Sequence, residues 1–171
     1  SNPTINYQLS QGDQLKTLNL YLRDHAGNIA QQQQNIQLDT TPPVISAIST
    51  LPPYNNSDSL QISLTVDKPN EEVLFYFLSS TNQTPSLAEN WIAFDQNSLN
   101  IPLDFSGVSG LQNRYLWLRD GIGNLTPLYT LQTTIDRNPP TLTNFLINEG
   151  DNFTNSTTVA LSWNATDDVS G

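Results

Sequence analysis

The sequence predicts an all-β chain of tandem two-sheet Greek-key β-sandwiches, and an internal repeat is the main reason. The nine residues Leu20–Asn28 return 96 positions later as Leu116–Asn124. A second pair of similar segments, Asp39–Pro43 and Asp136–Pro140, is separated by 97 positions. A period of this length suits one small sandwich domain and is too long for a solenoid repeat. The chain is therefore expected to contain similar modules in a row, and to be cut inside a module at both ends.

The repeat divides the chain into three parts. Residues 1–39 are expected to be the C-terminal strands of one module, 40–136 a complete module, and 137–171 the N-terminal strands of a third. The proline pairs Pro42-Pro43 and Pro139-Pro140 mark the joints. Proline lacks a backbone donor and favours extended backbone before it, so it ends strand pairing and stiffens a linker.

The central part shows the alternation of apolar and polar residues that is typical of half-buried strands. No window shows helical periodicity. Seven short strands are expected between the two joints, at 44–48, 60–66, 73–78, 91–94, 99–105, 115–118 and 128–135. Seven strands in about 97 residues are typical of a Greek-key sandwich.

Composition excludes several functional classes. The 171 residues carry a net charge of −10 with only six Lys and Arg, which disfavours nucleic-acid binding because a phosphate-binding face needs clustered cations. Cysteine is absent, so neither disulfides nor thiol chemistry is available. Methionine is also absent, and we therefore expect the segment to be internal to a longer reading frame. No apolar run is long enough to insert into a membrane.

The repeated stretch ends in an Asp-x-x-Gly-Asn hairpin in both copies. An aspartate side chain can accept backbone N–H groups further along a turn, and glycine and asparagine tolerate positive φ. This reading explains both copies without a ligand, and it identifies the turn-defining residues as Asp24, Gly27, Asn28, Asp120, Gly123 and Asn124.

Taken together, these motifs resemble the bacterial immunoglobulin-like (Big-type) repeats of large surface proteins and adhesins. The resemblance rests on Leu-x-Leu-Arg-Asp-x-x-Gly-Asn, on the Asp-x-x-Pro-Pro joint, and on Thr166–Gly171 (Thr-Asp-Asp-Val-Ser-Gly). It covers nearly all of the chain. It implies immunoglobulin-like modules strung into an extended stalk or fibre on a bacterial cell surface, with neighbouring modules as partners.

The same resemblance implies calcium at the joints, because some members of that family hold calcium there. In a sandwich of this topology, the second-to-third strand loop and the last hairpin lie at the pole where the chain enters. For the central module this pole would gather Asp39, Asp67 and Asp120, with Glu71 as a further candidate. For the next module it would gather Asp136 with Asp167 or Asp168. Carboxylates that converge without cations repel one another, and a hard cation with oxygen ligands relieves the repulsion. No other cofactor is expected.

The leading functional prediction is a non-enzymatic extracellular stalk or fibre segment, whose host-cell, glycan or surface ligand is bound by other parts of the protein. One alternative is a spacer or carbohydrate-binding module of a secreted polysaccharide-degrading enzyme, in which Tyr21, Trp91 or Trp117 could stack on sugar rings. The more common role of such rings is packing.

A second alternative is a self-assembling surface-layer or filament subunit, with missing strands supplied by another chain. No recurring nucleophile, base or acid pair supports catalysis.

Overall fold

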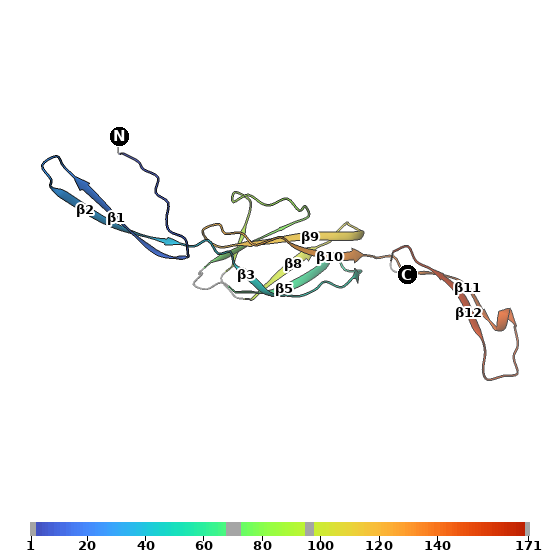
Figure 1. The fold of residues 1–171 in the computed structure, drawn as a ribbon. Helices are drawn as coiled ribbons and strands as arrows, with labels where there is room; N and C mark the ends of the chain where they lie inside the picture. The colour runs from blue at the N-terminus through green and yellow to red at the C-terminus, as the bar shows by residue number, and fades with distance from the viewer. Residues whose placement is uncertain (1–2, 68–72, 95–97, 170–171) are drawn as a thin grey trace.

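The computed structural model describes residues 3–67, 73–94 and 98–169, and these residues confirm the all-β prediction (Figure 1). Within the described ranges, twelve strands and one short 3-10 turn, η1 (Asn148–Gly150), follow one another. The strands are β1 (Gln14–Arg23), β2 (Ile29–Leu38), β3 (Val44–Ile48), β4 (Tyr54–Asn55), β5 (Ser59–Asp67), β6 (Leu74–Ser79), β7 (Ile92–Phe94), β8 (Ser98–Asp104), β9 (Gly110–Arg119), β10 (Tyr129–Ile135), β11 (Thr141–Ile147) and β12 (Leu161–Thr166).

Strands β3 to β10 form a sandwich of two sheets. One sheet has the order β3-β5-β8 and the other the order β4-β10-β9-β6-β7. All pairs are antiparallel except β4 with β10, which are parallel. The chain crosses between the sheets several times, and this arrangement of two facing antiparallel sheets is that of an immunoglobulin-like sandwich.

The core of the sandwich follows directly from the alternation in the sequence. On β5, the side chains of Ile62, Leu64 and Val66 are at most 2% exposed, while the residues between them face outward. Ile62 pairs across from Ile101 of β8, and the opposite sheet contributes Leu116 of β9. Each such side chain stabilises the fold by roughly 1.5–3 kcal/mol on full burial. The central module therefore has an interior of its own.

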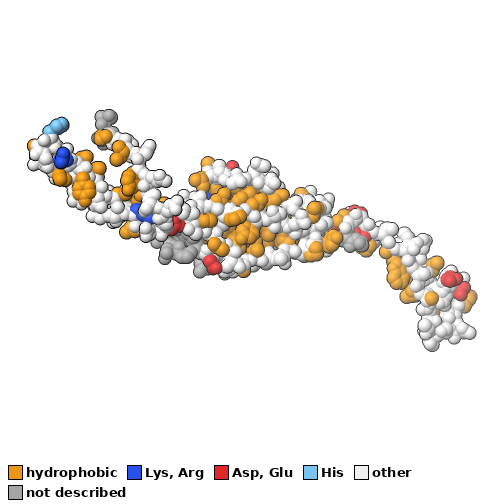
Figure 2. Space-filling model, viewed as in Figure 1, with side chains coloured by type: hydrophobic (Ala, Val, Ile, Leu, Met, Phe, Trp, Pro, Cys, Tyr) orange, Lys and Arg blue, Asp and Glu red, His pale blue; other side chains and the backbone are white. Residues whose placement is uncertain are grey.

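The remaining strands form two separate two-stranded sheets. The β1-β2 hairpin and the β11-β12 pair lie at opposite ends of the sandwich (Figure 1). Both carry hydrophobic side chains at the surface, which Figure 2 shows as orange patches on the two ends. Leu20 and Leu22 are 51% and 62% exposed, whereas their repeat equivalents Leu116 and Leu118 are fully buried. The same sequence pattern is thus buried in the central module and exposed in the β1-β2 hairpin.

All seven expected strands of the central module are present, with ends that differ by a few residues. An eighth strand, β4, was not predicted. It consists of Tyr54 and Asn55, which pair with Thr134 and Ile135 of β10. Two residues are too few to show an alternating pattern, so periodicity could not reveal this strand. β4 is nevertheless important, because it brings the chain alongside the last strand just before the second joint.

Candidate functional site

The second joint brings three carboxylates together. Asp136 follows β10, and Asp167 and Asp168 follow β12. One carboxylate oxygen from each lies within 4.8 Å of the others, and among the described residues no other group of three acidic, histidine or cysteine side chains does so. The sequence analysis grouped Asp136 with either Asp167 or Asp168, and the structure places all three at one point. A hollow lined by Pro140 and residues 165–169 lies beside them.

Hydrogen bonds fix the positions of these carboxylates. The backbone N–H of Asn138 donates to Asp136 Oδ1 at 3.1 Å, and the Asn138 side chain donates to Asp168 Oδ2 at 2.8 Å. The N–H of Val169 donates to Asp167 Oδ1 at 3.1 Å. Asn138 therefore links the end of the central module to the loop after β12.

One oxygen of this cluster has no hydrogen-bond donor. Asp136 is only 8% exposed, and its Oδ2 atom is buried without a hydrogen-bond partner among the described residues. A buried carboxylate oxygen without a donor is costly, and such a group in a native structure calls for an explanation. A bound ion is one physical explanation for an oxygen of this kind. The donor set therefore fits a hard cation.

The first joint has the same local turn and different surroundings. The N–H of Thr41 donates to Asp39 Oδ1 at 3.0 Å, as Asn138 does to Asp136. Asp67 lies at the end of β5, opposite Val44. Among the described residues Asp39, Asp67 and Asp120 do not form a group like that of the second joint. Glu71, the further candidate, lies outside the described residues.

The Asp120 carboxylate is occupied by its own hairpin. Its Oδ1 accepts the N–H groups of Ile122, Gly123 and Asn124 at 2.7–3.0 Å, and its Oδ2 accepts the Asn124 side-chain amide at 2.7 Å. Asp120 is fully buried. Gly123 has a φ of +103°, which suits glycine. The carboxylate thus acts as a turn-closing group in this structure, and four hydrogen-bond donors of the hairpin compete with any cation for it.

The first hairpin is built in the same way. The Asn28 N–H and side-chain amide both donate to Asp24 at 2.8 Å, and Gly27 has a φ of +93°. The hydrogen bonds from Asn28 lower the pKa of Asp24. Unlike Asp120, Asp24 is exposed to solvent.

A carboxylate that the sequence analysis did not identify ties the first joint to the preceding hairpin. Asp13 accepts hydrogen bonds from the N–H and Oγ1 of Thr40, at 2.9 and 2.8 Å, and from the Oγ1 of Thr41. These bonds, led by that of Thr41, lower the pKa of Asp13 to about 2. No sequence signal marks Asp13, because its partners lie 27 and 28 positions away.

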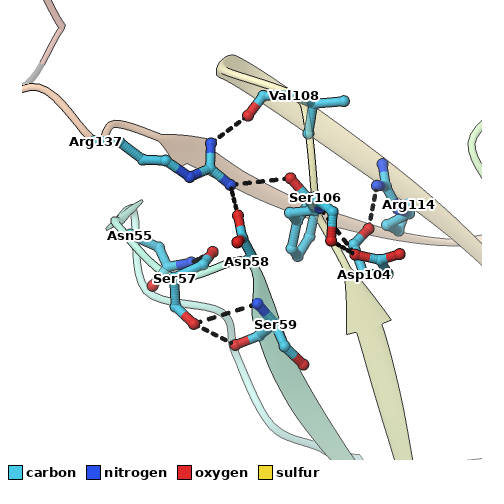
Figure 3. A network of polar contacts seen from close by, with 10 residues as sticks. Asn55, Ser57, Asp58, Ser59, Asp104, Ser106, Val108, Arg114 and Arg137 are labelled. Carbon is cyan, nitrogen blue, oxygen red and sulfur yellow. Dashed lines mark hydrogen bonds and ion pairs between the residues drawn. The ribbon is translucent and has the colours of Figure 1, made fainter.

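The second joint is tied back by an arginine (Figure 3). The guanidinium of Arg137 donates to the carboxylate of Asp58 at 2.5 Å and to the carbonyls of Val108 and Phe105 at 2.5 and 3.0 Å. Arginine presents several donors in a rigid fork and can hold three acceptors at once. Both joints are therefore anchored to the part of the chain that precedes them, one by Asp13 and the other by Arg137.

The aromatic residues on the outer face of the β9 sheet are packed against one another. Trp117 is only 2% exposed and lies 6.3 Å from the ring of Phe77, which in turn lies 5.6 Å from Trp91. The guanidinium of Arg119 lies over the rings of Phe75 and Trp91 at 4.1 and 5.0 Å. Trp117 therefore offers no open ring face on which a sugar could stack.

No protein-family model matches the chain, and no curated protein matches it. Among solved structures, the chain is similar to the PKD domain of an M14-like peptidase from Thermoplasmatales archaeon SCGC AB-540-F20. The identity is 14%, the TM-score is 0.42, and the match covers 57% of this chain and 98% of the other. In the described part of the chain, no helix has the length and apolar character needed to cross a bilayer. The architecture of strands β3 to β10 is that of an immunoglobulin-like β-sandwich.

Proposed function

We propose that this chain is a non-enzymatic segment of an extracellular bacterial surface protein, in which immunoglobulin-like modules are joined into a stiff stalk or fibre. The observation that carries the proposal is the first joint, which is held from both sides. Asp13 of the preceding hairpin binds Thr40 and Thr41, and Asn124 of the central module binds the carbonyl of Asp39. Such contacts fix the direction in which one module leaves the next.

Two further observations support a stalk. The central module buries its own apolar residues, so it can act as an independent unit in a row. The surface is acidic and rich in uncharged polar side chains, which suits a soluble spacer. The sugar-binding alternative receives less support, because Trp117 is packed under neighbouring aromatic rings.

The test of location uses antibodies raised against residues 1–171 on intact and permeabilised source cells. Labelling of intact cells is the expected result. Labelling that requires permeabilisation would contradict the proposed surface location. Small-angle X-ray scattering of the same chain should give an elongated profile, whereas a compact profile would contradict the stalk.

A second proposal concerns the second joint, where we place a calcium ion bound by Asp136, Asp167 and Asp168. The buried, unpartnered Oδ2 of Asp136 is the observation that favours it. Calcium accepts six to eight oxygen ligands in flexible geometry, so carbonyls or water would complete the set. The ion would neutralise the mutual repulsion of the carboxylates and lock the loop after β12 to the end of β10.

The experiment is a pair of melting curves of the full chain, one in calcium and one in EDTA. An ion that binds only the folded state raises the melting temperature, and the increase grows with the logarithm of the ion concentration above Kd. We expect an increase with calcium that Asp136→Asn abolishes. As a matched control, Asp151→Asn removes an exposed acidic side chain that makes no contact with the joint and should leave the calcium effect intact. Equal melting temperatures with and without calcium would contradict the proposed calcium site.

A further inference from the structure

We propose that the free part of the β10 edge, at Thr130, Leu131 and Gln132, binds an extended peptide segment of a partner protein as an added strand. The segment is uncharged, runs antiparallel to β10, and carries an apolar side chain opposite Gln132. All strands that border this edge lie between the two joints, so the edge belongs to the central module alone. The proposal depends neither on the stalk nor on the calcium site.

β4 covers only the end of β10. The N–H of Thr134 donates to the Pro53 carbonyl at 2.9 Å, so the backbone groups of Thr134 point toward β4 and away from β9. Backbone groups of alternate residues point to the same side of a strand, and those of Thr130 and Gln132 therefore also point away from β9. β4 pairs with Thr134 and Ile135 and reaches no further along β10. Among the described residues, the N–H and C=O groups of Thr130 and Gln132 thus have no backbone partner.

The other described edges of the sandwich carry features that hinder such pairing. The β8 edge includes Pro102, which lacks an N–H, and the charged Asp104. β3 has an irregular register between Ile45 and Ala47, and β7 is three residues long. Proline, charge, bulges and short length are the means by which natural sheets prevent unwanted pairing. The free part of β10, Thr130–Gln132, contains neither proline nor a charged residue, so it stays open to an added strand.

An apolar hollow lies next to the free edge, where β4 begins. It has a volume of about 340 Å³ and is lined by Leu51, Pro53, Tyr54, Leu111 and Gln132, among others, and none of its lining residues is charged. Tyr54 and Leu111 are 54% and 61% exposed. A strand added beside Gln132 lies in line with β4, so its side chain opposite Gln132 points to the same face of the sheet as Tyr54.

The hollow and the free edge together define the partner's chemistry. When a strand is added to a sheet edge, main-chain hydrogen bonds give affinity and pockets for alternate side chains give specificity. Thr130 and Gln132 offer two N–H donors and two carbonyl acceptors to an extended backbone. The hollow selects an apolar, uncharged side chain at the position opposite Gln132.

The register favours a peptide over the same edge of a second copy. If two β10 strands paired antiparallel through both of their free residues, Thr130 of one copy would lie opposite Gln132 of the other. Residue 128 of the second copy would then lie opposite Thr134, in the place where Tyr54 already pairs. A peptide whose first ordered residue lies opposite Gln132 avoids this overlap.

The test is an NMR titration of the ¹⁵N-labelled chain 1–171 with the acetylated and amidated peptide Ser-Leu-Val-Thr-Ser, up to millimolar concentration. The central Leu, Val and Thr of this peptide are designed to lie opposite Gln132, Leu131 and Thr130. We expect the N–H signals of Thr130 and Gln132 to shift. The N–H groups of Leu131 and Thr133 face β9 and serve as the internal control, with smaller shifts.

Two methylated peptides test whether the main chain is recognised. In the antiparallel arrangement, the N–H of the peptide's Leu points at β10, while that of its Val points away. N-methylation of the Leu should weaken binding about fivefold, the effect of losing one neutral hydrogen bond. N-methylation of the Val should leave binding unchanged.

Substitutions in the chain test the edge and the hollow separately. Thr130→Pro removes an outward N–H and preserves the pairing with β9, because proline is tolerated where the N–H of an edge strand faces solvent. It should weaken binding by the same factor of about five. Leu111→Ser, in the hollow, should also weaken binding, whereas Leu87→Ser should not, although Leu87 is 64% exposed.

The results that would overturn the proposal are specific. They are the absence of shifts at Thr130 and Gln132, equal affinities of the two methylated peptides, and binding unaffected by Thr130→Pro. If Thr130→Pro does not fold, the methylated peptides still decide the question on the unaltered chain. Shifts of the same two amides with chain concentration alone would show that a second copy occupies the edge, and would contradict the peptide as its partner.

Discussion

The side-chain amide of Asn124 donates a hydrogen bond to the backbone carbonyl of Asp39, across 85 positions of sequence. The same amide donates to the buried carboxylate of Asp120. One side chain thus connects the last hairpin of the module to the joint by which the chain enters. The module cannot lose this hairpin without also loosening the joint.

Replacement of Asn124 should therefore destabilise the central module. Asn124→Ala leaves the Asp120 carboxylate with one donor fewer in a fully buried position, which costs about 1–3 kcal/mol. Urea denaturation monitored by tryptophan fluorescence gives the change. Asn28→Ala is the matched control, because its hairpin is exposed, and it should leave the midpoint of the central module unchanged. Equal effects of the two substitutions would contradict this role for Asn124.

A second prediction concerns a buried hydroxyl beneath the same hairpin. Thr126 is 4% exposed, and its Oγ1 accepts the backbone N–H of Leu118 at 2.9 Å. Thr126→Val conserves the shape and leaves that N–H without a partner, so the free energy of unfolding should fall by about 1–3 kcal/mol. Thr130→Val, at an exposed position of β10, should change it by less than about 0.5 kcal/mol. Thermal or urea unfolding of both variants checks the difference.

The pKa of Asp13 makes the first joint sensitive to acid. Its folded pKa of about 2 lies below the ordinary value of 3.8, because Thr41 and Thr40 donate hydrogen bonds to the charged form. Because folding lowers the pKa of Asp13, the stabilisation that its ionised side chain gives to the folded state is complete above the ordinary pKa of 3.8. This stabilisation disappears as the pH falls toward 2. An NMR titration of the carboxyl carbon should show a midpoint near the lowered pKa. Thr40→Val with Thr41→Val should return it toward 3.8, and an unchanged midpoint would contradict the assigned cause.

The anchor of the second joint depends on the shape of arginine. Arg137→Lys preserves the charge but cannot reach Asp58, Phe105 and Val108 together, so it should behave like Arg137→Ala. The ion pair with Asp58 is partly exposed and contributes at most about 1 kcal/mol, so Asp58→Asn should have a small effect. Hydrogen exchange at the amides of Asn138 and Thr141, which flank the proline pair, measures the loss. Full rescue by lysine would show that charge alone holds the joint.

Much of the fold could be predicted from the sequence because burial imposes a period of two on each strand. Ile62, Leu64 and Val66 alternate with polar residues, and all three are buried, as are the alternating Leu116 and Leu118. The acidic residues of the second joint could also be grouped, because the repeat fixes which loops meet at one end of a sandwich. β4 could not be found this way, because parallel pairing of two residues leaves no pattern.

The anchoring contacts were also beyond the sequence. Asp13 and Arg137 act on partners that the fold brings near. Asp13 lies outside the repeated motifs, and Arg137 occupies a variable position of the Asp-x-x-Pro-Pro joint, where the first copy has Thr40. For Asp120 two roles were considered, turn closure and calcium binding. The structure shows which atoms surround the carboxylate, namely three backbone N–H groups and one amide. Whether Asp120 closes the turn or binds a cation depends on the direction of its side chain, which spacing along the chain does not encode.

The central claim is that the joints hold neighbouring modules in a fixed direction, and an electron spin distance measurement across the first joint tests it most directly. The chain has no cysteine, so Gln33→Cys and Gln61→Cys place labels uniquely on exposed positions of β2 and β5. We predict one narrow distance distribution that broadens with Asp13→Ala. Asp104→Ala removes a comparable carboxylate away from the joint and should leave the width of the distribution unchanged. A broad distribution in the unaltered chain would contradict the account.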